Sequence, residues 1–445
     1  MRADAGGADP STLYLVSDLH VGGNEQLGEV DFEPELLAFL ETLETTGEDA
    51  ELIVNGDAFG LWEFTQVDGI EKFDVLLDQH PELFEQLRAT GETVPITLIP
   101  GNHDYELAAI DEYVGRLAEY NVTLEQEEVI TREVGDRLIW IEHGQQRDPS
   151  NRSPDFGNPY ANPLGYFVNR HVTSKAGTLS ERGRYNWLKD IQAVTPMELI
   201  PEWIVSNYFY REMNPLLRYA VLPFLLLFEV SALYLVLVVL AVAGVWSAPL
   251  DFVHGLIRSL GVVGEFIDLI VVANLVIIVL LSIIGIPLYL FVRDVRKTVR
   301  RFGIVDPRAA RHVGDAYLEG AREVFAAHPN VAVFVYGHTH RASLTEVDDR
   351  LVINTGTWLK RLRRKSVLLG PLPPVFYPSY RLNYFRIEAA GADGDVAVEY
   401  HVVEKPNPKE LTLVQRLLTR RPKREEPIPE RTVVGGDRSR SDGNG

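Results

Sequence analysis

Two long apolar segments constrain the fold of this 445-residue chain more than any other feature. They run from 220 to 246 and from 269 to 292, and the second contains no charged residue. Because an α-helix rises about 1.5 Å per residue, about 20 apolar residues are enough to cross a bilayer. The alternative, a pair of helices buried in a large soluble core, usually carries a polar stripe. We therefore expect a transmembrane hairpin.

The distribution of basic residues predicts how this hairpin is oriented. In the loop from 247 to 268 the only arginine or lysine is Arg258. Both outer flanks, in contrast, are basic, with Arg211, Arg218, Arg293, Arg296, Lys297, Arg300 and Arg301. By the positive-inside rule, both flanks lie in the cytoplasm. The polar N-terminus has no apolar core of the kind found in a secretory signal. We expect a multi-pass protein of the cell membrane whose catalytic domain faces the cytoplasm.

An even number of crossings returns the chain to its starting side, so residues before and after the hairpin can build one domain. The predicted organisation is a polar segment at 1–11, a first part of the domain at 12–210, the hairpin at 211–301, a second part at 302–410 and a tail at 411–445. The tail is charged and rich in proline and glycine, which predicts disorder. Its basic residues would contact anionic lipid headgroups or simply be solvated.

The composition limits the chemistry. The chain has no cysteine, which excludes disulfides and thiolate ligands, so any metal must be bound by His, Asp, Glu or Asn. The net charge of -20 argues against nucleic acid as a partner, since the phosphate backbone is usually met by a basic surface. An acidic chain with only nine lysines and no cysteine is similar to proteins of salt-loving archaea.

Six short apolar runs predict buried strands, and each is followed at once by a polar turn. The strands are expected at Thr12–Val16, Leu52–Val54, Ile96–Ile99, Leu138–Ile141, Val331–Val335 and Leu351–Ile353. The turns read, in order, Ser-Asp-Leu-His, Asn-Gly-Asp, Pro-Gly-Asn-His-Asp, Glu-His-Gly, Tyr-Gly-His-Thr-His and Asn-Thr-Gly-Thr-Trp. Because strand ends collect at one edge of a sheet, we expect these polar groups to converge.

Each motif alone is common, because an acid or a histidine after a strand often only satisfies backbone groups. Five of the 11 histidines nevertheless fall within these turns, in a specific order. This ordered set resembles the calcineurin-like metallophosphoesterase superfamily over about residues 13–357, apart from the hairpin. The resemblance implies an α/β fold, a two-sheet metallophosphoesterase sandwich flanked by helices, with an inserted two-helix transmembrane hairpin.

The resemblance also implies two metal sites that share Asp57. One would use Asp18, His20, Asp57 and His340, and the other would use Asp57, Asn102, His143 and His338. His103 would be the catalytic histidine, oriented by Asp104. A carboxylate can bind two cations, and imidazole and amide ligands suit divalent manganese, iron or zinc, of which we expect two Mn²⁺ ions. A hydroxide that bridges the metals would attack phosphorus.

The substrate is predicted less closely. The chain reads Ala-Phe-Gly-Leu-Trp after Asp57, where many members of the family carry a second acid three residues on. This segment and the Asn-Thr-Gly-Thr-Trp turn resemble the branch of the UDP-diacylglucosamine diphosphatases, although that branch has an arginine where His103 stands. A phosphorylated small molecule or a lipid is the expected substrate. Arg147 and Arg152 would bind its phosphate bidentately, or lie in a surface loop.

Three functions remain open. The first is a membrane-anchored hydrolase of phosphoester or pyrophosphate bonds. The second is a tethered cyclic-nucleotide phosphodiesterase. The third is a catalytically silent membrane sensor or scaffold with the same fold, which a missing ligand would favour, whereas all the expected ligand positions are present. A transporter is disfavoured because two spans with one acidic residue offer little for a pathway.

Overall fold

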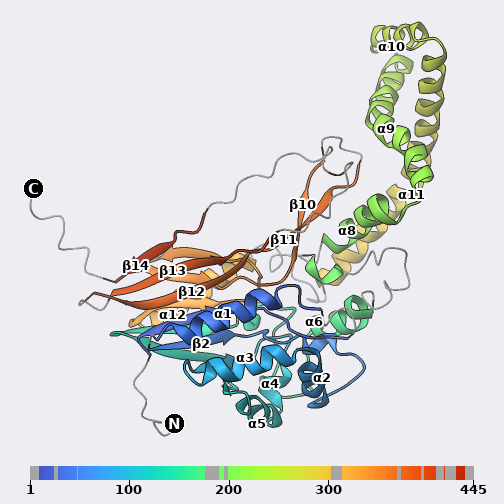
Figure 1. The fold of residues 1–445 in the computed structure, drawn as a ribbon. Coiled ribbons are helices and arrows are strands. Elements are labelled where there is room, and N and C mark those ends of the chain that lie inside the picture. Colours follow the sequence, from blue (N-terminus) through green and yellow to red (C-terminus); the bar gives the residue numbers. More distant parts are fainter. Residues whose placement is uncertain are drawn as a thin grey trace, which may run out of the picture.

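The computed structural model describes residues 10–24, 29–47, 49–175, 190–194, 199–301, 313–367, 372–391, 395–406, 415 and 427–435. Two β-sheets lie against each other, helices pack on their outer faces, and a long helical hairpin projects away from them (Figure 1). The expected two-sheet sandwich flanked by helices is therefore confirmed.

The larger sheet has seven strands in the order β14-β13-β12-β1-β2-β3-β4, and the smaller has five in the order β5-β6-β7-β9-β8. A separate hairpin pairs β10 with β11. The strands are β1 Thr12–Val16, β2 Ala50–Asn55, β3 Ile96–Ile99, β4 Val122–Leu124, β5 Val129–Val134, β6 Arg137–Glu142, β7 Val331–Tyr336, β8 Ser343–Val347, β9 Arg350–Asn354, β10 Arg361–Lys365, β11 Val375–Ser379, β12 Leu382–Ala390, β13 Asp395–Val403 and β14 Arg431–Val434.

All six predicted strands are present, but they belong to two sheets. β1, β2 and β3 are parallel neighbours in the larger sheet. β6, β7 and β9 are parallel neighbours in the smaller sheet. The polar turns therefore converge from the edges of two packed sheets, and not from one sheet edge as the strand pattern alone suggests.

The side chains of β1 explain why these strands are apolar throughout. Leu13 and Leu15 point into the core between the two sheets, whereas Tyr14 and Val16 point into the core between the larger sheet and its helices. A strand that is buried on both faces shows a continuous apolar run and not an alternation. A third core packs α12 against the outer face of the smaller sheet.

The helices connect and cover these sheets. They are α1 Glu33–Thr45, α2 Glu71–Gln79, α3 Pro81–Gly91, α4 Glu106–Ala109, α5 Glu112–Ala118, α6 Leu164–Val168, α8 Ile200–Asn207, α9 Pro215–Val242, α10 Ala248–Ser259, α11 Val262–Arg301 and α12 Val313–Ala327. Single turns form η2 Leu61–Glu63, η3 Gln145–Arg147, η4 Asn169–Thr173, η6 Ile191–Ala193 and η8 Tyr208–Glu212.

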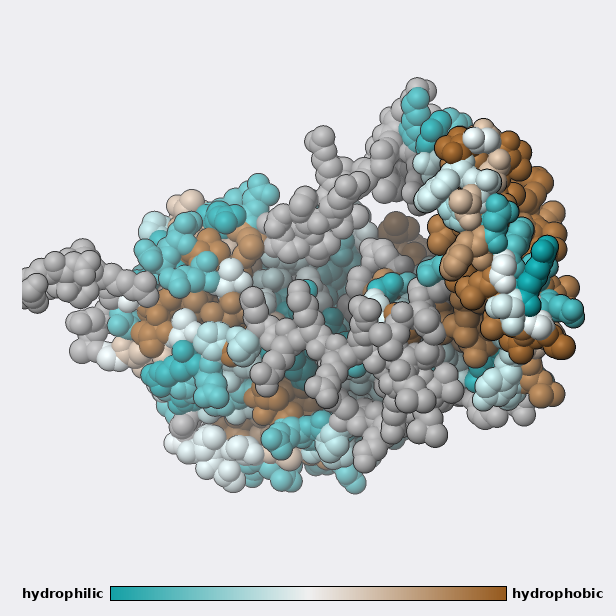
Figure 2. All heavy atoms as spheres, turned by 90° about the horizontal axis from the view of Figure 1, so that it is seen from above, coloured by the Kyte–Doolittle hydropathy of each residue, from teal (hydrophilic) through white to brown (hydrophobic). Residues whose placement is uncertain are grey.

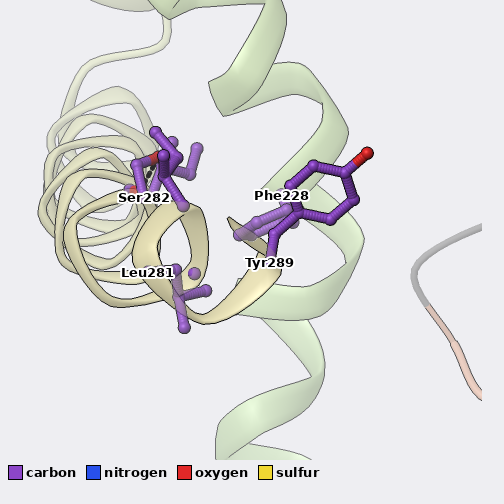
Figure 3. Close-up of a pocket in the computed structure, with 7 residues that line it drawn as sticks. Phe228, Leu281, Ser282 and Tyr289 are labelled. Atoms are coloured by element: carbon purple, nitrogen blue, oxygen red, sulfur yellow. Dashed lines mark hydrogen bonds between the residues drawn. The ribbon is translucent and has the colours of Figure 1, made fainter. Parts of the chain in front are cut away.

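The two predicted spans correspond to α9 and α11, which are long and apolar enough to cross a membrane. Only 6% and 17% of their most apolar windows are buried within the protein, so neither is the core helix of a soluble domain. Figure 2 shows their apolar side chains gathered on one projecting part of the molecule. A shallow groove on this hairpin is lined by Phe228, Leu281, Ser282 and Tyr289 among others, and it contains none of the predicted site residues (Figure 3).

The helix boundaries differ from the predicted spans for local reasons. The first helix starts at Pro215, because the Asn214 side chain accepts a hydrogen bond from the Leu216 amide and caps it. It ends at Val242, and Gly244 then adopts a left-handed conformation that ends helices. The second helix is longer than its apolar part because charged residues continue it to Arg301.

Within the hairpin a buried amide joins the two long helices. Asn274 of α11 donates to the carbonyl of Phe224 at 3.0 Å and contacts the hydroxyl of Ser231 at 3.1 Å, both on α9. A polar group in an apolar environment is costly unless it is bonded, so these contacts favour one alignment of the two helices.

The hairpin of β10 and β11 links the catalytic sheets to the long helices. Leu362 and Phe376 pack with Trp203 of α8 in one small apolar cluster. Val375 packs with Tyr210 in a second cluster that also touches the first turns of α9. The long helices therefore pack on the β10–β11 hairpin, which the chain itself joins to β9 of the smaller sheet and to β12 of the larger sheet.

The prediction of a disordered tail is wrong for residues 431–434. These form β14, which pairs with β13 and buries Val434 against the core between the sheets. An alternating Arg-Thr-Val-Val segment is too short to be recognised by its composition. The predicted basic cluster of the tail, with Arg416, Arg420, Arg421, Lys423 and Arg424, lies outside the described residues, as does most of the segment 1–11.

Candidate metal centre

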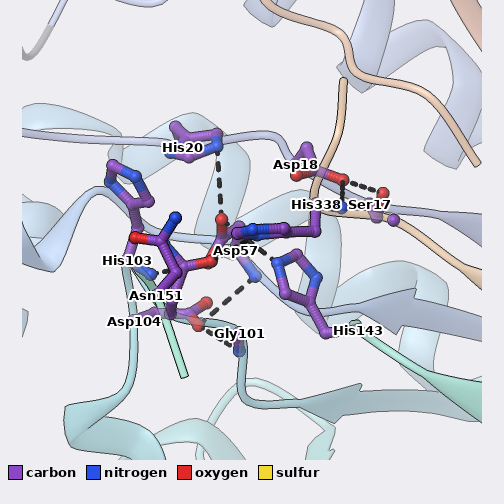
Figure 4. A network of polar contacts seen from close by, with 12 residues as sticks. Ser17, Asp18, His20, Asp57, Gly101, His103, Asp104, His143, Asn151 and His338 are labelled. Atoms are coloured by element: carbon purple, nitrogen blue, oxygen red, sulfur yellow. Dashed lines mark hydrogen bonds and ion pairs between the residues drawn. The ribbon is translucent and has the colours of Figure 1, made fainter. Parts of the chain in front are cut away.

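The predicted ligands come from the carboxyl ends of parallel strands in both sheets. Asp18 and His20 follow β1, Asp57 follows β2, and Asn102 follows β3. From the smaller sheet, His143 follows β6, and His338 and His340 follow β7. Figure 4 shows Asp18, His20, Asp57, His143 and His338 turned toward one another. The sheets thus bring residues that are up to 322 positions apart into one site.

The first group contains Asp18, His20, Asp57 and His340, each offering a ligand atom within 4.8 Å of the others. Nε2 of His340 lies 3.1 Å from Oδ1 of Asp18, and Nε2 of His20 lies 3.6 Å from Oδ2 of Asp57. Two carboxylates and two imidazoles form a donor set that suits a divalent transition metal without thiolate.

The second group contains Asp57, His143 and His338 within the same distance of one another. Nε2 of His143 lies 3.3 Å from Oδ2 of Asp57, the oxygen that also faces His20. Oδ1 of Asn102 lies 2.7 Å from Nδ1 of His338, so this amide belongs to the same group. Asp57 therefore lies between the two groups and is a member of both.

Several ligand atoms lack the hydrogen bonds that buried polar atoms usually have. Among the described residues, Oδ1 of Asp18, Oδ2 of Asp57 and Nε2 of His143 form no well-directed hydrogen bond, although imidazole nitrogens lie 3.1 to 3.6 Å from the two carboxylate oxygens, and all three side chains are almost completely buried. Leaving a buried polar atom unpaired costs about 1–3 kcal/mol, and more for a charged one. Divalent cations between these atoms would satisfy them, so the residues present fit two metals.

The backbone at these positions is strained. Five predicted ligands have positive φ angles of 47 to 62°, namely Asp18, His20, Asp57, His338 and His340. This left-handed region costs a non-glycine residue about 1 kcal/mol or more, and such strain concentrates at functional sites. The tight turns aim consecutive side chains at one point, which a regular strand cannot do.

Carboxylates and imidazoles of the site shift each other's pKa values. Burial alone would raise the pKa of Asp57, but the nearby imidazoles of His143 and His103 hold it well below its usual range. Burial would likewise lower the pKa of His143, yet the carboxylate of Asp57 raises it to about 10. For His20, burial and the charge of His103 lower the pKa to about 3. Nδ1 of His143 contacts the carbonyl of Asn55 at 2.8 Å, which turns Nε2 toward the site.

The turn after β9 supports the site from behind. The amide of Asn354 donates to the carbonyl of Gly337 at 2.8 Å, just before the two histidines. Oγ1 of Thr357 donates to the carbonyl of Asp18 at 2.6 Å. Trp358 is fully buried among the helices on the larger sheet. The late Asn-Thr-Gly-Thr-Trp motif therefore holds the ligand turns and is not itself a ligand.

Asp104 is placed differently from its expected role. Its carboxylate accepts backbone amides, from Gly101 at 2.6 Å, Ala58 at 2.7 Å, and Asp57 and Phe59 at 3.3 Å. Burial and the charge of Asp57 raise the pKa of Asp104 to about 7. Asp104 thus joins the turn after β2 to the turn after β3, and in this way it orients the backbone that carries His103.

Glu63 is the carboxylate that contacts the ring of His103, and the sequence did not predict it. Oε1 of Glu63 lies 3.0 Å from Nδ1 of His103. A side chain at position 60 has no room, because a Cβ on Gly60 would lie 3.1 Å from Oε2 of Glu63 and 2.7 Å from the carbonyl of Gly22. Glu63 therefore occupies this space from a later position, and an acid six residues after Asp57 was the available signal.

The environment of His103 favours its charged form. Burial would lower the pKa of His103, but Glu63 and Asp57 raise it to about 9. The Trp62 ring lies 4.5 Å from the His103 ring, centroid to centroid, and limits its movement. His103 also donates its backbone amide to Oδ1 of Asp57 at 2.7 Å, which ties it to the proposed bridging ligand.

A second acid that the motifs did not indicate lies beside the site. Oδ2 of Asp148 is 3.1 Å from Nε2 of His338 and accepts a hydrogen bond from the amide of Asn151 at 2.7 Å. Hydrogen bonding to His338 lowers the pKa of Asp148 to about 2, against the effect of its burial. Figure 4 shows Asn151 close to His103.

Arg147 and Arg152 line a common cavity with Glu128, Gln146 and Phe156. The guanidinium of Arg147 is already bonded, because Nη2 donates to Oε2 of Glu142 at 3.0 Å, and it lies over the ring of Phe334. A paired arginine has less capacity to bind a phosphate bidentately. Arg152 is exposed, and among the described residues its side chain forms no ion pair like that of Arg147.

Comparisons with known proteins found one family model and several distantly similar solved structures. A family model described as calcineurin-like phosphoesterase matches residues 11–230, ending within α9 and before His338 and His340. Similar solved structures include a single mutant of Vps29 from Entamoeba histolytica, with 10% identity, coverage of 88% of this chain and 92% of that chain, and a TM-score of 0.26. Among curated protein sequences, none matches this chain.

Two further structures extend the comparison. A conserved protein of Streptococcus pneumoniae TIGR4, titled a predicted phosphoesterase, has 9% identity, 91% and 97% coverage and a TM-score of 0.26. Wild-type Vps29 from Entamoeba histolytica complexed with zinc has 9% identity, 88% and 99% coverage and a TM-score of 0.24. Likenesses this distant carry no argument about function, and the account of the site rests on its own geometry.

Proposed function

We propose that this chain, which contains a calcineurin-like metallophosphoesterase domain, hydrolyses a phosphoester or pyrophosphate bond at the cytoplasmic face of a membrane. The observation that carries the proposal is Oδ2 of Asp57, a buried atom without a hydrogen-bond partner that lies within 3.6 Å of a histidine from each ligand group. A carboxylate that is shared by two cations must have an oxygen between the two ligand groups, and Oδ2 of Asp57 lies there.

The ligand sets divide as follows. Asp18, His20 and His340 would hold one divalent cation and Asn102, His143 and His338 the other, with Asp57 common to both. Bound there, a pair of cations polarises the phosphoryl group and makes a water molecule acidic enough to attack phosphorus. Manganese is the metal we propose, because the donor set has oxygen and imidazole but no sulfur.

His103 supplies the proton in the proposed reaction. Glu63 holds Nδ1, which leaves Nε2 of the same ring directed away from that carboxylate. A cationic imidazole can donate to a phosphoryl oxygen as charge builds up, or protonate the leaving group. Stacking on Trp62 and the backbone bond to Asp57 keep the ring beside the metal ligands during this transfer.

A lipid-linked substrate, including a lipid diphosphate like that of the UDP-diacylglucosamine diphosphatases, is the finer part of the proposal. Its support is the apolar hairpin, which is attached to the catalytic sheets through β10 and β11 and would hold the site close to the bilayer. Anchoring raises the local concentration of a lipid substrate. Arg152 is the side chain that we propose binds a phosphate or nucleotide group of it, with Arg147 in a weaker role.

The catalytic proposal is tested by metal-dependent hydrolysis with purified protein in detergent. The substrates are an aryl phosphate, an aryl phosphodiester, cyclic nucleotides and lipid-linked diphosphates, each with manganese, zinc, iron or chelator. We expect metal-dependent turnover that Asp57→Ala abolishes and the exposed His171→Ala retains. Preference for cyclic nucleotides would favour a tethered phosphodiesterase. Bound metal without any turnover would favour a silent sensor or scaffold.

The membrane proposal is tested separately by cysteine labelling, since the chain contains no cysteine of its own. Val262 is the first residue of α11, after the turn that follows α10, and is exposed, whereas Thr93 lies in an exposed turn beside the larger sheet. In intact cells an impermeant maleimide should label Val262→Cys, and it should label Thr93→Cys only after lysis. Labelling of both from outside, or of neither, would contradict the proposed orientation.

A further inference from the structure

A short helical segment that precedes the hairpin in sequence, separated from α9 by residues 174–214, contacts the proposed catalytic site. It consists of α6 and η4, residues 164–173, and we call it the pre-hairpin segment. None of its residues belongs to the six polar turns that supply the predicted ligands. In Figure 1 α6 lies on the side of the domain that faces the long helices. Its side chains nevertheless make directed contacts with the turn η2 that carries Glu63.

Asn169 makes the most informative of these contacts. Its Nδ2 donates to Oε1 of Glu63 at 3.1 Å, and that same oxygen lies 3.0 Å from Nδ1 of His103. Oγ of Ser174 donates to Oδ1 of Asn169 at 3.0 Å, which fixes which end of the amide faces Glu63. A chain of hydrogen bonds therefore runs from the pre-hairpin segment through Glu63 to the proposed proton donor.

Other contacts hold the segment against the same turn. Nη1 of Arg170 donates to the carbonyl of Phe64 at 3.0 Å, and Nη2 donates to Asp68 at 2.8 Å. The Tyr166 ring packs edge-on against Trp62 with 5.7 Å between centroids, and Trp62 itself stacks on the ring of His103. These contacts place Asn169 independently of its own hydrogen bond.

The energetics explain why Glu63 needs this partner. Its side chain is only 7% exposed, and a carboxylate so poorly hydrated needs hydrogen-bond donors to stay in one rotamer. Hydrogen bonds to charged groups contribute about 1.5–3 kcal/mol. When the amide donor is lost, Glu63 can rotate toward water, and His103 then loses the acceptor that orients its ring.

We propose that Asn169 is a positioning residue, which holds Glu63 so that the ring of His103 is oriented toward the leaving group. The proposal rests on the hydrolase function proposed above. It also means that the orientation of the proton donor depends on a segment outside the six polar turns that supply the predicted ligands.

The test uses three variants of the full-length protein in detergent. Asn169→Ala removes the amide, Asn169→Asp keeps its size but removes the N–H donor, and His171→Ala is the matched control on the same helical turn, where the side chain is exposed. Each is assayed on phenyl phosphate, a poor leaving group, and on 4-nitrophenyl phosphate, a good one. Hydrolysis depends strongly on protonation of the leaving group only when that group is a poor one, as in phenyl phosphate.

We expect both Asn169 variants to lower kcat on phenyl phosphate about 10-fold, the loss of one charged hydrogen bond, with a smaller effect on 4-nitrophenyl phosphate and little change in KM. His171→Ala should match the wild type. If Asn169 had a purely structural role, its variants would lower kcat equally on both substrates. If Asn169→Asp behaves as the wild type, packing and not the hydrogen bond is what matters, and the proposal is overturned.

A second readout needs no turnover. Diethyl pyrocarbonate modification of His103 is followed by peptide mass spectrometry in metal-free protein, and both Asn169 variants should react faster than the wild type and His171→Ala. Unchanged reactivity in both variants would overturn the positioning role. If the wild type hydrolyses nothing with any metal, the hydrolase proposal fails, while the modification rates still decide whether Asn169 orients His103.

Discussion

Metal binding should displace a proton from His143, and this exchange is the consequence of the site that can be worked out most fully. In the metal-free protein, burial would lower the pKa of His143, but Asp57 at 3.3 Å raises it to about 10. The imidazole is therefore protonated at pH 7.5 and cannot bind a metal. A metal ion must replace the proton before Nε2 can serve as a ligand.

The size of the effect follows from the distance between the pKa and the pH. The pKa of His143, about 10, lies about 2.5 units above pH 7.5. Removing its proton at this pH therefore costs about 3 kcal/mol, which lowers the apparent metal affinity about 300-fold. The affinity for the site that contains His143 should therefore rise about tenfold per pH unit between pH 7 and 9. His20 adds nothing to this dependence, because burial lowers its pKa to about 3 and it is already neutral.

The stability of the metal-free protein should change with pH in the opposite direction to its affinity for metal. A histidine whose pKa is raised on folding contributes stability below pH 6.5, and that stability is lost as the pH rises toward 10. The metal-free protein should therefore become less stable over the range in which the protein binds metal more tightly. Thermal unfolding with chelator, from pH 6.5 to 10, measures this decline.

Isothermal titration in buffers with different ionisation enthalpies counts the protons released. Wild-type protein should release about one proton more than His143→Asn, whose neutral amide keeps a potential ligand in place. The difference isolates His143 from any proton that a bound water loses. Equal release by the two proteins, or an affinity that does not change from pH 7 to 9, would show that His143 does not exchange its proton for a metal.

Three further perturbations test other parts of the site. Glu63→Gln keeps the size of the side chain but removes its charge, and it should lower kcat about 100-fold at unchanged metal content, as metal analysis alongside the assay will show. Gly101→Ala should weaken metal binding, because its Cβ would lie 2.2 Å from Oδ1 of the bridging aspartate, whereas Gly115→Ala meets no atom within 4 Å and should bind metal normally. Lys72→Met leaves the Glu106 carboxylate without its buried partner and should destabilise the protein by about 3 kcal/mol, seen as a lower midpoint of unfolding.

The parts of the fold that local sequence determines were predictable. β1 and β3 have the predicted boundaries because their apolar runs end at Ser17 and Pro100, where polar or turn residues follow. What the pattern did not contain is which strands pair. Pairing depends on contacts between distant residues, and so the division of six strands between two sheets appeared only in the structure.

The ligand residues were predictable for a different reason. They directly follow strands, and in such turns the backbone of Asp18 or Asp57 adopts positive φ angles that bring side chains to one point. Glu63 and Asn169 do not lie in turns that directly follow a strand. Asn169 lies 106 residues after Glu63, and their contact depends on how the pre-hairpin segment packs, which no short motif records.

The apolar helices illustrate what hydropathy can and cannot determine. Hydropathy located both spans, because a run of apolar side chains is a property of composition alone. The helix ends depend on single groups, such as the Asn214 cap and the left-handed Gly244, which a hydropathy average does not contain. Similarly, β14 is stabilised by pairing with β13, so its composition alone predicted disorder.

The most direct test of the central claim is a metal titration in which bound metal and turnover are measured on the same metal-free protein. The account predicts two manganese ions per chain and activity that appears only when both are bound, with Asp57→Asn losing both binding and turnover. Full activity with one metal per chain, or turnover in the presence of chelator with no metal bound, would contradict a centre built on a shared Asp57.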